Sequence, residues 1–170
     1  NRNRIIQLIQ EAENKQIDVL CLPELCISGY GCEDQFLAPY TIDQSWESLL
    51  LISEHVHDTL VILGLPITFE GKLYNVAACL FEQKIHALIP KQFLANDGVH
   101  YEARWFDPWP SQKLAYFQKE GRRIPLGDYR LQFNQIVIGI EICQDAWEGD
   151  KRPAHVLAKR GVSLICNPTA

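Results

Sequence analysis

The order of apolar patterns along the chain predicts an α/β fold built in layers. Residues 3–15 have the spacing of an amphipathic helix, and they lead into a short apolar run, residues 18–22, that Pro23 ends. A second helical pattern covers residues 45–57. Three strand-like segments follow it: LVILGLPITF, LYNVAACLF and KIHALIP. A helix, a strand, a second helix and a run of strands are typical of a sheet with helices packed on it.

The second half of the chain contains a long irregular segment followed by shorter elements. Residues 91–113 are rich in aromatic, charged and proline residues and follow neither a helical nor a strand period. Long ordered loops in compact domains usually carry function, so we expect this loop to contribute to a site. The remaining patterns predict strands at residues 130–133 and 135–142, a helix at 153–160 and a closing strand at 162–166.

Composition and charge argue against several classes of protein. The 170 residues fit one domain, and a hydrophobic content of 47% is enough to fill a core. The net charge of −5 has the wrong sign for a nucleic-acid partner, and we interpret the one basic run, residues 119–123, as a solvated loop. No apolar run approaches the roughly 18 residues of a membrane span, and no signal-peptide pattern is present. We therefore expect a cytoplasmic protein without a membrane partner.

The six cysteines predict reduced thiols and no metal site. They form no CxxC pair and have no cluster of histidines near them, as a zinc site would need. Cys21, Cys79 and Cys166 lie inside apolar runs, where a thiol usually behaves as a small hydrophobic side chain. We expect these three to belong to the core.

Three reactive side chains occupy the same kind of position, directly after an apolar strand. Glu24 follows Pro23, Lys91 follows Pro90, and Cys143 follows the run GIEI and precedes polar residues. A strand fixes the position of such a residue while the loop after it exposes the side chain. At such a position Glu24 can face a pocket partly screened from water, which suits a carboxylate to proton transfer near neutral pH.

Each of these residues alone has a more common explanation. A glutamate after a strand is more often a surface charge or a helix cap, a single lysine is more often solvated, and a single cysteine is more often buried and inert. The combination is more specific. Attack of a thiol on an amide needs a proton acceptor, a proton donor for departing ammonia, and positive charge or N–H groups facing the oxyanion. Glu24, Lys91 and Cys143 supply these groups as one set.

Three segments of the chain resemble a known family. PELCISGYGCED, PKQFLANDGVHYEARWF and GIEICQDAW are similar, in family order, to the Glu, Lys and Cys segments of the nitrilase (carbon-nitrogen hydrolase) superfamily. The GYGCED stretch and the NDGVHYE loop more closely resemble the glutaminase domain of glutamine-dependent NAD synthetases. The resemblance covers nearly the whole chain and implies a four-layer α-β-β-α sandwich. It places Glu24, Lys91 and Cys143 at the superfamily's catalytic positions.

The resemblance also implies an activity and a set of pocket residues. Glutamine would be hydrolysed through a cysteine thioester, and the ammonia would serve the ATP-dependent amidation of deamido-NAD by a synthetase domain. Substrate-binding residues would be Tyr30, His100, Tyr101, Glu102 and Gln144. Tyr30 is equally well explained as a tyrosine packed under a loop. Gln144 stands where relatives often have an acidic residue, which leaves the contact to the substrate's amino group open.

The resemblance implies further parts outside the sequence. The chain has no initiator Met and stops just after an apolar strand, so we expect residues 1–170 to be an incomplete glutaminase domain. A synthetase domain is expected beyond residue 170, and with it ATP and Mg, because residues 1–170 contain no nucleotide-binding loop. No cofactor is expected in residues 1–170. A homo-oligomer is implied by the resemblance.

Three other interpretations remain open at the level of the sequence. The first is a free-standing amidase of the same superfamily that acts on a small ω-amide or carbamoyl compound. A papain-like Cys–His enzyme is the second, although none of the five histidines has a recognisable triad context. A scaffold domain that kept the fold and lost the chemistry is the third, and the presence of all three catalytic residue types argues against it.

Overall fold

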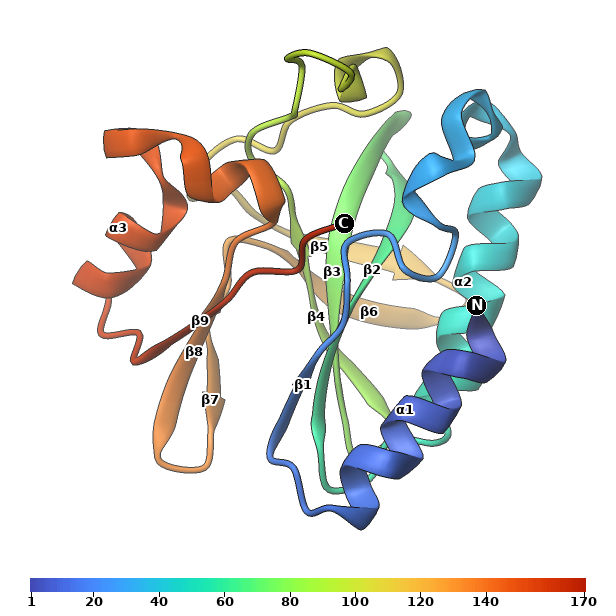
Figure 1. Ribbon diagram of the computed structural model, residues 1–170, viewed down its shortest axis with the longest axis vertical. Coiled ribbons are helices and arrows are strands. Elements are labelled where there is room, and N and C mark those ends of the chain that lie inside the picture. Colours follow the sequence, from blue (N-terminus) through green and yellow to red (C-terminus); the bar gives the residue numbers. More distant parts are fainter.

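The computed structural model describes residues 1–170 and consists of two sheets that face each other, with helices on both outer sides (Figure 1). The larger sheet has six strands in the order β1-β2-β3-β4-β6-β5, and the smaller has three in the order β7-β8-β9. Helices α1 (Arg2–Asn14) and α2 (Pro39–Ser53) cover the outer face of the larger sheet, and α3 (Pro153–Lys159) packs on the smaller one. The predicted four layers, α-β-β-α, are confirmed.

The larger sheet combines a parallel pair with an antiparallel meander. Its strands are β1 (Val19–Cys21), β2 (Leu60–Phe69), β3 (Lys72–Phe81), β4 (Lys84–Pro90), β5 (Leu114–Lys119) and β6 (Arg122–Gly127). β1 runs parallel to β2, while β2, β3 and β4 are antiparallel neighbours. β1 and β4 therefore run in the same direction, and their carboxyl ends lie at the same edge of the sheet. Glu24 follows one of these ends and Lys91 follows the other.

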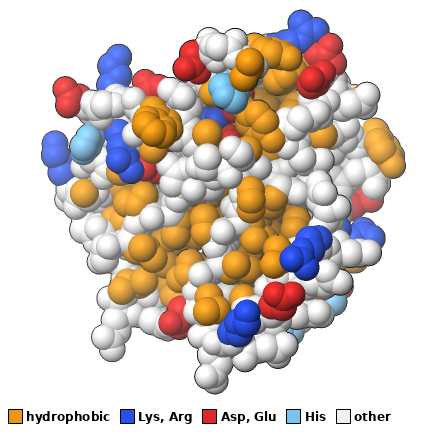
Figure 2. Space-filling model, in the orientation of Figure 1, with side chains coloured by type: hydrophobic (Ala, Val, Ile, Leu, Met, Phe, Trp, Pro, Cys, Tyr) orange, Lys and Arg blue, Asp and Glu red, His pale blue; other side chains and the backbone are white.

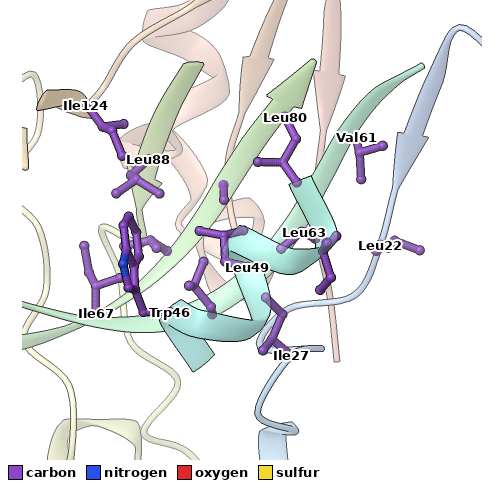
Figure 3. Close-up of a cluster of buried hydrophobic side chains, with 14 of the residues drawn as sticks. Leu22, Ile27, Trp46, Leu49, Val61, Leu63, Ile67, Leu80, Leu88 and Ile124 are labelled. Atoms are coloured by element: carbon purple, nitrogen blue, oxygen red, sulfur yellow. The ribbon is translucent and has the colours of Figure 1, made fainter. Parts of the chain in front are cut away.

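A helix-facing core holds α1 and α2 against the larger sheet (Figure 3). Ile9 of α1, Leu49 of α2 and Leu63 of β2 are completely buried in it. Burying one such side chain contributes about 1.5–3 kcal/mol relative to exposure, so this core is the main attachment of both helices. α2 begins at Pro39 rather than at residue 45, because proline is well suited to the first turn of a helix. No helix of the structure combines the length and apolar character needed to cross a membrane.

The smaller sheet packs against the opposite face of the larger one. Its strands are β7 (Leu131–Phe133), β8 (Ile136–Ile140) and β9 (Leu164–Cys166). A second core between the sheets includes Cys79 and Cys166, as predicted. The prediction that Cys21 belongs to the core is wrong, because β1 is an edge strand and its Cys21 is exposed. In the view of Figure 2, hydrophobic side chains gather over the middle of the molecule. Leu164 of β9 is 39% exposed.

The hairpin of β5 and β6 is the one pair of strands that the sequence patterns missed. The interpretation of residues 119–123 as a loop is wrong, since Lys119 ends β5, Arg122 begins β6, and only Glu120 and Gly121 form the turn. Both turn residues have positive φ, 52° and 76°, as tight hairpin turns require. The hairpin was missed because charged residues gather around its turn: Lys119, Glu120, Arg122 and Arg123.

Four 3-10 segments occupy the loops around the edge where the strands end. They are η1 (Tyr30–Leu37), η2 (Glu102–Arg104), η3 (Cys143–Trp147) and η4 (Gly149–Lys151). The predicted loop at residues 91–113 is confirmed, and η2 is its only regular turn. Since η1, η2 and η3 follow β1, β4 and β8 in the chain, three loops from two sheets meet at one edge (Figure 1).

Gly64 of β2 determines how closely the Glu24 turn approaches the sheet. A Cβ atom at Gly64 would lie 2.0 Å from the backbone nitrogen of Leu25 and 2.7 Å from the carbonyl carbon of Glu24. We predict that Gly64→Ala displaces this turn and lowers the free energy of unfolding by about 1–3 kcal/mol, as overpacking typically does. Urea denaturation measures this change.

Gly31→Ala is the matched control for that substitution. Gly31 has a φ of −81°, and no heavy atom lies within 4 Å of the place that a Cβ atom would take. The free energy of unfolding of this variant should therefore change by no more than about 0.5 kcal/mol. Equal effects of the two substitutions would contradict the importance of the close approach at Gly64.

Candidate active site

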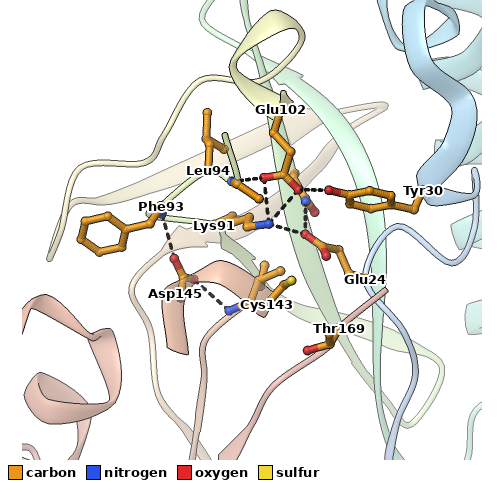
Figure 4. A network of polar contacts seen from close by, with 12 residues as sticks. Glu24, Tyr30, Lys91, Phe93, Leu94, Glu102, Cys143, Asp145 and Thr169 are labelled. Atoms are coloured by element: carbon orange, nitrogen blue, oxygen red, sulfur yellow. Dashed lines mark hydrogen bonds and ion pairs between the residues drawn. The ribbon is translucent and has the colours of Figure 1, made fainter. Parts of the chain in front are cut away.

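A buried ammonium group between two carboxylates forms the centre of the site (Figure 4). Lys91 Nζ lies 2.6 Å from Glu24 Oε1 and 2.8 Å from Glu102 Oε1. All three residues are only 1% exposed. Burial by itself lowers the pKa of Lys91, but the carboxylates of Glu24 and Glu102 outweigh it and the net shift is upward. The lysine is therefore a permanent cation inside the protein.

Backbone and amide donors hold the two carboxylates in place. Asn75 Nδ2 donates to Glu24 Oε1 at 2.7 Å, and the backbone N–H of Ala95 donates to Glu102 Oε2 at 2.9 Å. The N–H of Lys91 donates to the carbonyl oxygen of Asn75 at 2.9 Å, which ties the lysine to strand β3. Glu24 Oε1 thus has two donors, whereas Glu24 Oε2 is buried without any hydrogen-bond partner.

Cys143 is presented at the first position of η3, shortly after strand β8 ends at Ile140. Its φ of 43° lies in the left-handed region that non-glycine residues rarely adopt. Backbone strain of this kind persists only where surrounding contacts hold it. Here the N–H of Cys143 donates to Asn167 Oδ1 at 2.9 Å and to the Pro168 carbonyl at 3.0 Å. The segment after β9 therefore fixes the orientation of the thiol.

The electrostatic environment keeps the thiol of Cys143 protonated. Burial and the Glu24 carboxylate raise its pKa to about 11, although the Lys91 ammonium opposes both effects. A neutral thiol is a weak nucleophile and needs a base that accepts its proton as it attacks. Glu24 also lines the pocket around Cys143, and its unpartnered Oε2 is the available acceptor.

The thiol opens into a pocket of about 540 Å³. Of the pocket residues predicted from the sequence, Tyr30, His100 and Gln144 line it beside Cys143 and Glu24. Four further lining residues were not predicted: Ala95, Asp97, Trp147 and Ala170. Asp97 lies in the NDGVHYE loop, so its place beside His100 was the one signal that could have identified it. Nothing in the sequence pattern marks Trp147 as a pocket residue.

The other two predicted pocket residues lie elsewhere. Glu102 is behind the pocket wall, where it accepts a hydrogen bond from the hydroxyl of Tyr30 at 2.8 Å in addition to its contact with Lys91. Burial raises the pKa of Tyr30, so the hydroxyl keeps its proton and remains a donor. The prediction that Tyr101 lines the pocket is wrong, because its ring is 50% exposed and packs on Trp105 with 5.1 Å between centroids.

Gln144 has a defined orientation in the pocket wall. Its side-chain Nε2 donates to Glu148 Oε1 at 3.0 Å, and Glu148 directly follows η3. The amide oxygen of Gln144 is therefore on the side away from Glu148. An amide that lines the pocket and is tied to the carboxylate of Glu148 stands where the resemblance led us to expect an acidic residue.

Solved structures with similar folds support the architecture. A glutamine-dependent NAD(+) synthetase from Cytophaga hutchinsonii superposes with a TM-score of 0.89 at 37% identity, covering 99% of this chain and 27% of that one. A mutant of an amidase from the nitrilase superfamily, from Nesterenkonia AN1, has a TM-score of 0.69 at 19% identity and is covered to 59%. At that identity the second likeness concerns the fold alone.

Curated relatives show the same similarity over nearly the whole length of this chain. The glutamine-dependent NAD(+) synthetases of Dictyostelium discoideum and Homo sapiens are 42% and 31% identical to this chain, over 98% of its length. The chain spans about a quarter of the length of these relatives, 25% in both cases. The model of the carbon-nitrogen hydrolase family matches residues 1–170 in full. The chain belongs to the carbon-nitrogen hydrolase family.

Proposed function

We propose that this chain is the glutamine amidohydrolase part of a glutamine-dependent NAD synthetase. The observation that carries the proposal is the arrangement of Cys143 beside the free Oε2 of Glu24, with the Lys91 ammonium held against the same carboxylate. Similarity over 98% of the chain to synthetases of that name supports the choice of glutamine as the substrate. Glu24, Lys91 and Cys143 are the proposed catalytic residues.

The first half of the reaction makes a thioester. Glu24 accepts the thiol proton as the sulfur of Cys143 attacks the carbonyl carbon of the glutamine side chain. The negative charge on the carbonyl oxygen develops near Lys91 and the backbone N–H of Gln144. Losing one such donor typically costs ~3 kcal/mol of transition-state stabilisation. Protonated Glu24 then gives its proton to the leaving nitrogen, so ammonia departs and the acyl group stays on sulfur.

The second half of the reaction hydrolyses the thioester. Glu24, ionised again, accepts a proton from water as the water oxygen attacks the acyl carbon. The sulfur leaves, takes the proton back from Glu24, and glutamate is released from a regenerated thiol. Glu102 takes no part in the proton transfers of this sequence. Its bond to Lys91 keeps the ammonium beside the oxyanion position, and Tyr30 keeps Glu102 in place.

The remaining parts of the proposal concern the surroundings of this site. The ammonia would be used by a synthetase domain beyond residue 170, with ATP and Mg bound there, for the amidation of deamido-NAD. The relatives' names and their fourfold greater length support such a domain. We also propose a cytoplasmic location, supported by six free cysteines, and a homo-oligomer, which the family resemblance implies.

The proposed function predicts that glutamine hydrolysis depends on one thiol. In the full-length protein, Cys143→Ala should reduce glutamate release to the background rate, because no other group can form the acyl intermediate. A chloroketone analogue of glutamine should add one label, which peptide mass spectrometry should locate at Cys143. Cys32→Ala is the control and should keep full activity, because Cys32 does not line the pocket.

Three outcomes would contradict this proposal in different ways. A protein that hydrolyses small ω-amides or carbamoyl compounds with a higher kcat/KM than glutamine would be a free-standing type of amidase. A protein in which Cys143 takes no label and glutamine is not hydrolysed would be a scaffold. Loss of activity in His100→Ala equal to that in Cys143→Ala would point to a Cys–His mechanism instead.

Glu24→Gln should separate the reactivity of the thiol from catalysis. The negative charge of Glu24 raises the pKa of Cys143, so its removal takes away one of the effects that oppose Lys91 and lowers that pKa. Alkylation of Cys143 by iodoacetamide at pH 8 should therefore become faster. Glutamine hydrolysis should fall by about 10²–10⁴-fold, the usual contribution of a general base. A parallel fall of both rates would exclude Glu24 as the base.

A further inference from the structure

Asp145 is a buried carboxylate that the proposed mechanism does not use. It is 1% exposed and does not line the pocket of Cys143. Its Oδ1 accepts hydrogen bonds from the backbone N–H groups of Gln92 at 3.0 Å and Phe93 at 2.8 Å. Its Oδ2 accepts the N–H of Ile142 at 2.8 Å. Figure 4 shows the side chain between the segment of Phe93 and the turn of Cys143.

These contacts join two segments that come from different sheets. Gln92 directly follows Lys91 at the end of β4 in the larger sheet, and Ile142 directly precedes Cys143 at the end of β8 in the smaller sheet. One carboxylate therefore spans the gap between the backbone that carries the ammonium and the backbone that carries the thiol. A side chain in this place can set the distance between the two reacting groups without touching a substrate.

The charge of Asp145 decides whether this link is complete. An ionised carboxylate accepts all three N–H groups, whereas a protonated one would turn a hydroxyl group toward an N–H donor. Burial raises the pKa of Asp145 to about 7, although the backbone donors and the nearby Lys91 ammonium lower it. Lys91 is the charged group that faces Asp145, and the carboxylates of Glu24 and Glu102 lie on Lys91 itself. The link should therefore open as the pH falls through about 7.

We propose that Asp145 is a positioning residue whose ionised carboxylate clamps the Lys91 segment onto the Cys143 turn. The proposal rests on the proposed function only insofar as glutamine hydrolysis is one of its readouts. The clamp keeps the ammonium within reach of the oxyanion that forms at Cys143. Its loss should lower the rate of the chemical step and leave substrate binding nearly unchanged.

The structure also separates this role from simple stabilisation of the fold. Because the pKa of Asp145 is higher in the folded chain than its ordinary value of 3.8, the folded state binds the proton more tightly. The contribution of Asp145 to stability therefore decreases as the pH rises from about 4 to about 7 and is lowest above pH 7. The ionised form of Asp145, which the link between the two segments needs, is thus the form that stabilises the folded chain less. A role in stability alone does not account for this placement.

Asp145→Asn in the full-length protein tests the proposal. The amide is of the same size, but its NH2 group must face an N–H donor on one side, so the clamp is broken. We expect kcat for glutamine to fall about 10²-fold, as small misplacements of reacting groups do, with KM changed less than threefold. The wild-type kcat should decline below about pH 7, and this decline should be absent in the variant.

Asp128→Asn is the matched control. Asp128 is also a buried carboxylate with a raised pKa, but its partner is Arg160, at 3.5 Å, and it does not line the pocket. Its substitution should leave kcat and the pH profile unchanged. The proposal would be overturned if Asp145→Asn kept the kcat of the wild type and the same decline of kcat below about pH 7. A loss of activity that merely follows the loss of folded protein, equal in both variants, would overturn it as well.

A second readout is independent of glutamine. Lys91 lowers the pKa of Cys143, so an opened clamp that moves the ammonium away should raise that pKa and slow alkylation by iodoacetamide at pH 8. If the wild-type protein does not hydrolyse glutamine but alkylation is slower in Asp145→Asn, the proposed function fails and the clamp stands. If glutamine is hydrolysed but neither alkylation nor kcat changes in the variant, the clamp fails and the proposed function stands.

Discussion

The buried ammonium of Lys91 is the interaction on which the rest of the site depends. A single charge in the interior is very unfavourable, and removing one partner from a buried ion pair typically costs about 3–5 kcal/mol. The ammonium therefore requires both carboxylates, and each comes from a different loop, Glu24 after β1 and Glu102 in η2. The same contacts that would act in catalysis thus fold the irregular segment of residues 91–113 onto the sheet.

Two carboxylates around one ammonium leave an excess of negative charge next to the thiol. Many reactive cysteines are activated by a lowered pKa, whereas burial and Glu24 raise the pKa of Cys143 to about 11. A protonated thiol is protected from oxidation and unspecific alkylation, which act on the thiolate. Reactivity then arises only when a bound carbonyl group accepts charge beside Lys91 while Glu24 Oε2 takes the proton. In this arrangement the substrate completes the activation of its own nucleophile.

The sequence predicted the site residues whose position along the chain is informative by itself. It missed the features that depend on contacts between distant segments. Glu24, Lys91 and Cys143 each follow a strand, so their shared position after an apolar run, taken as a set and with the family resemblance, identified them. The prediction for Cys21 was wrong because its apolar strand has the pattern of a buried strand, and only the order of strands in the sheet shows that β1 is at an edge. The exposed ring of Tyr101 and the hairpin of β5 and β6 depend likewise on which neighbours the fold supplies. Asp145 is two residues from Cys143, yet its role became apparent only from donors more than fifty positions away.

The two proposed reacting groups lie on different sheets, and this division explains why polar contacts surround them. The sheets are held together by an apolar core, and the hydrophobic effect that stabilises it is non-directional. Such a core cannot by itself fix a thiol and an ammonium to within a few tenths of an ångström, as catalysis by positioning demands. Hydrogen bonds are directional, and they occur here both across the gap and beside it: Asp145 ties the Lys91 segment to the turn, and Asn167, after β9 of the smaller sheet, holds the N–H of Cys143. Burial brings the sheets together, and these few bonds set the geometry of the site.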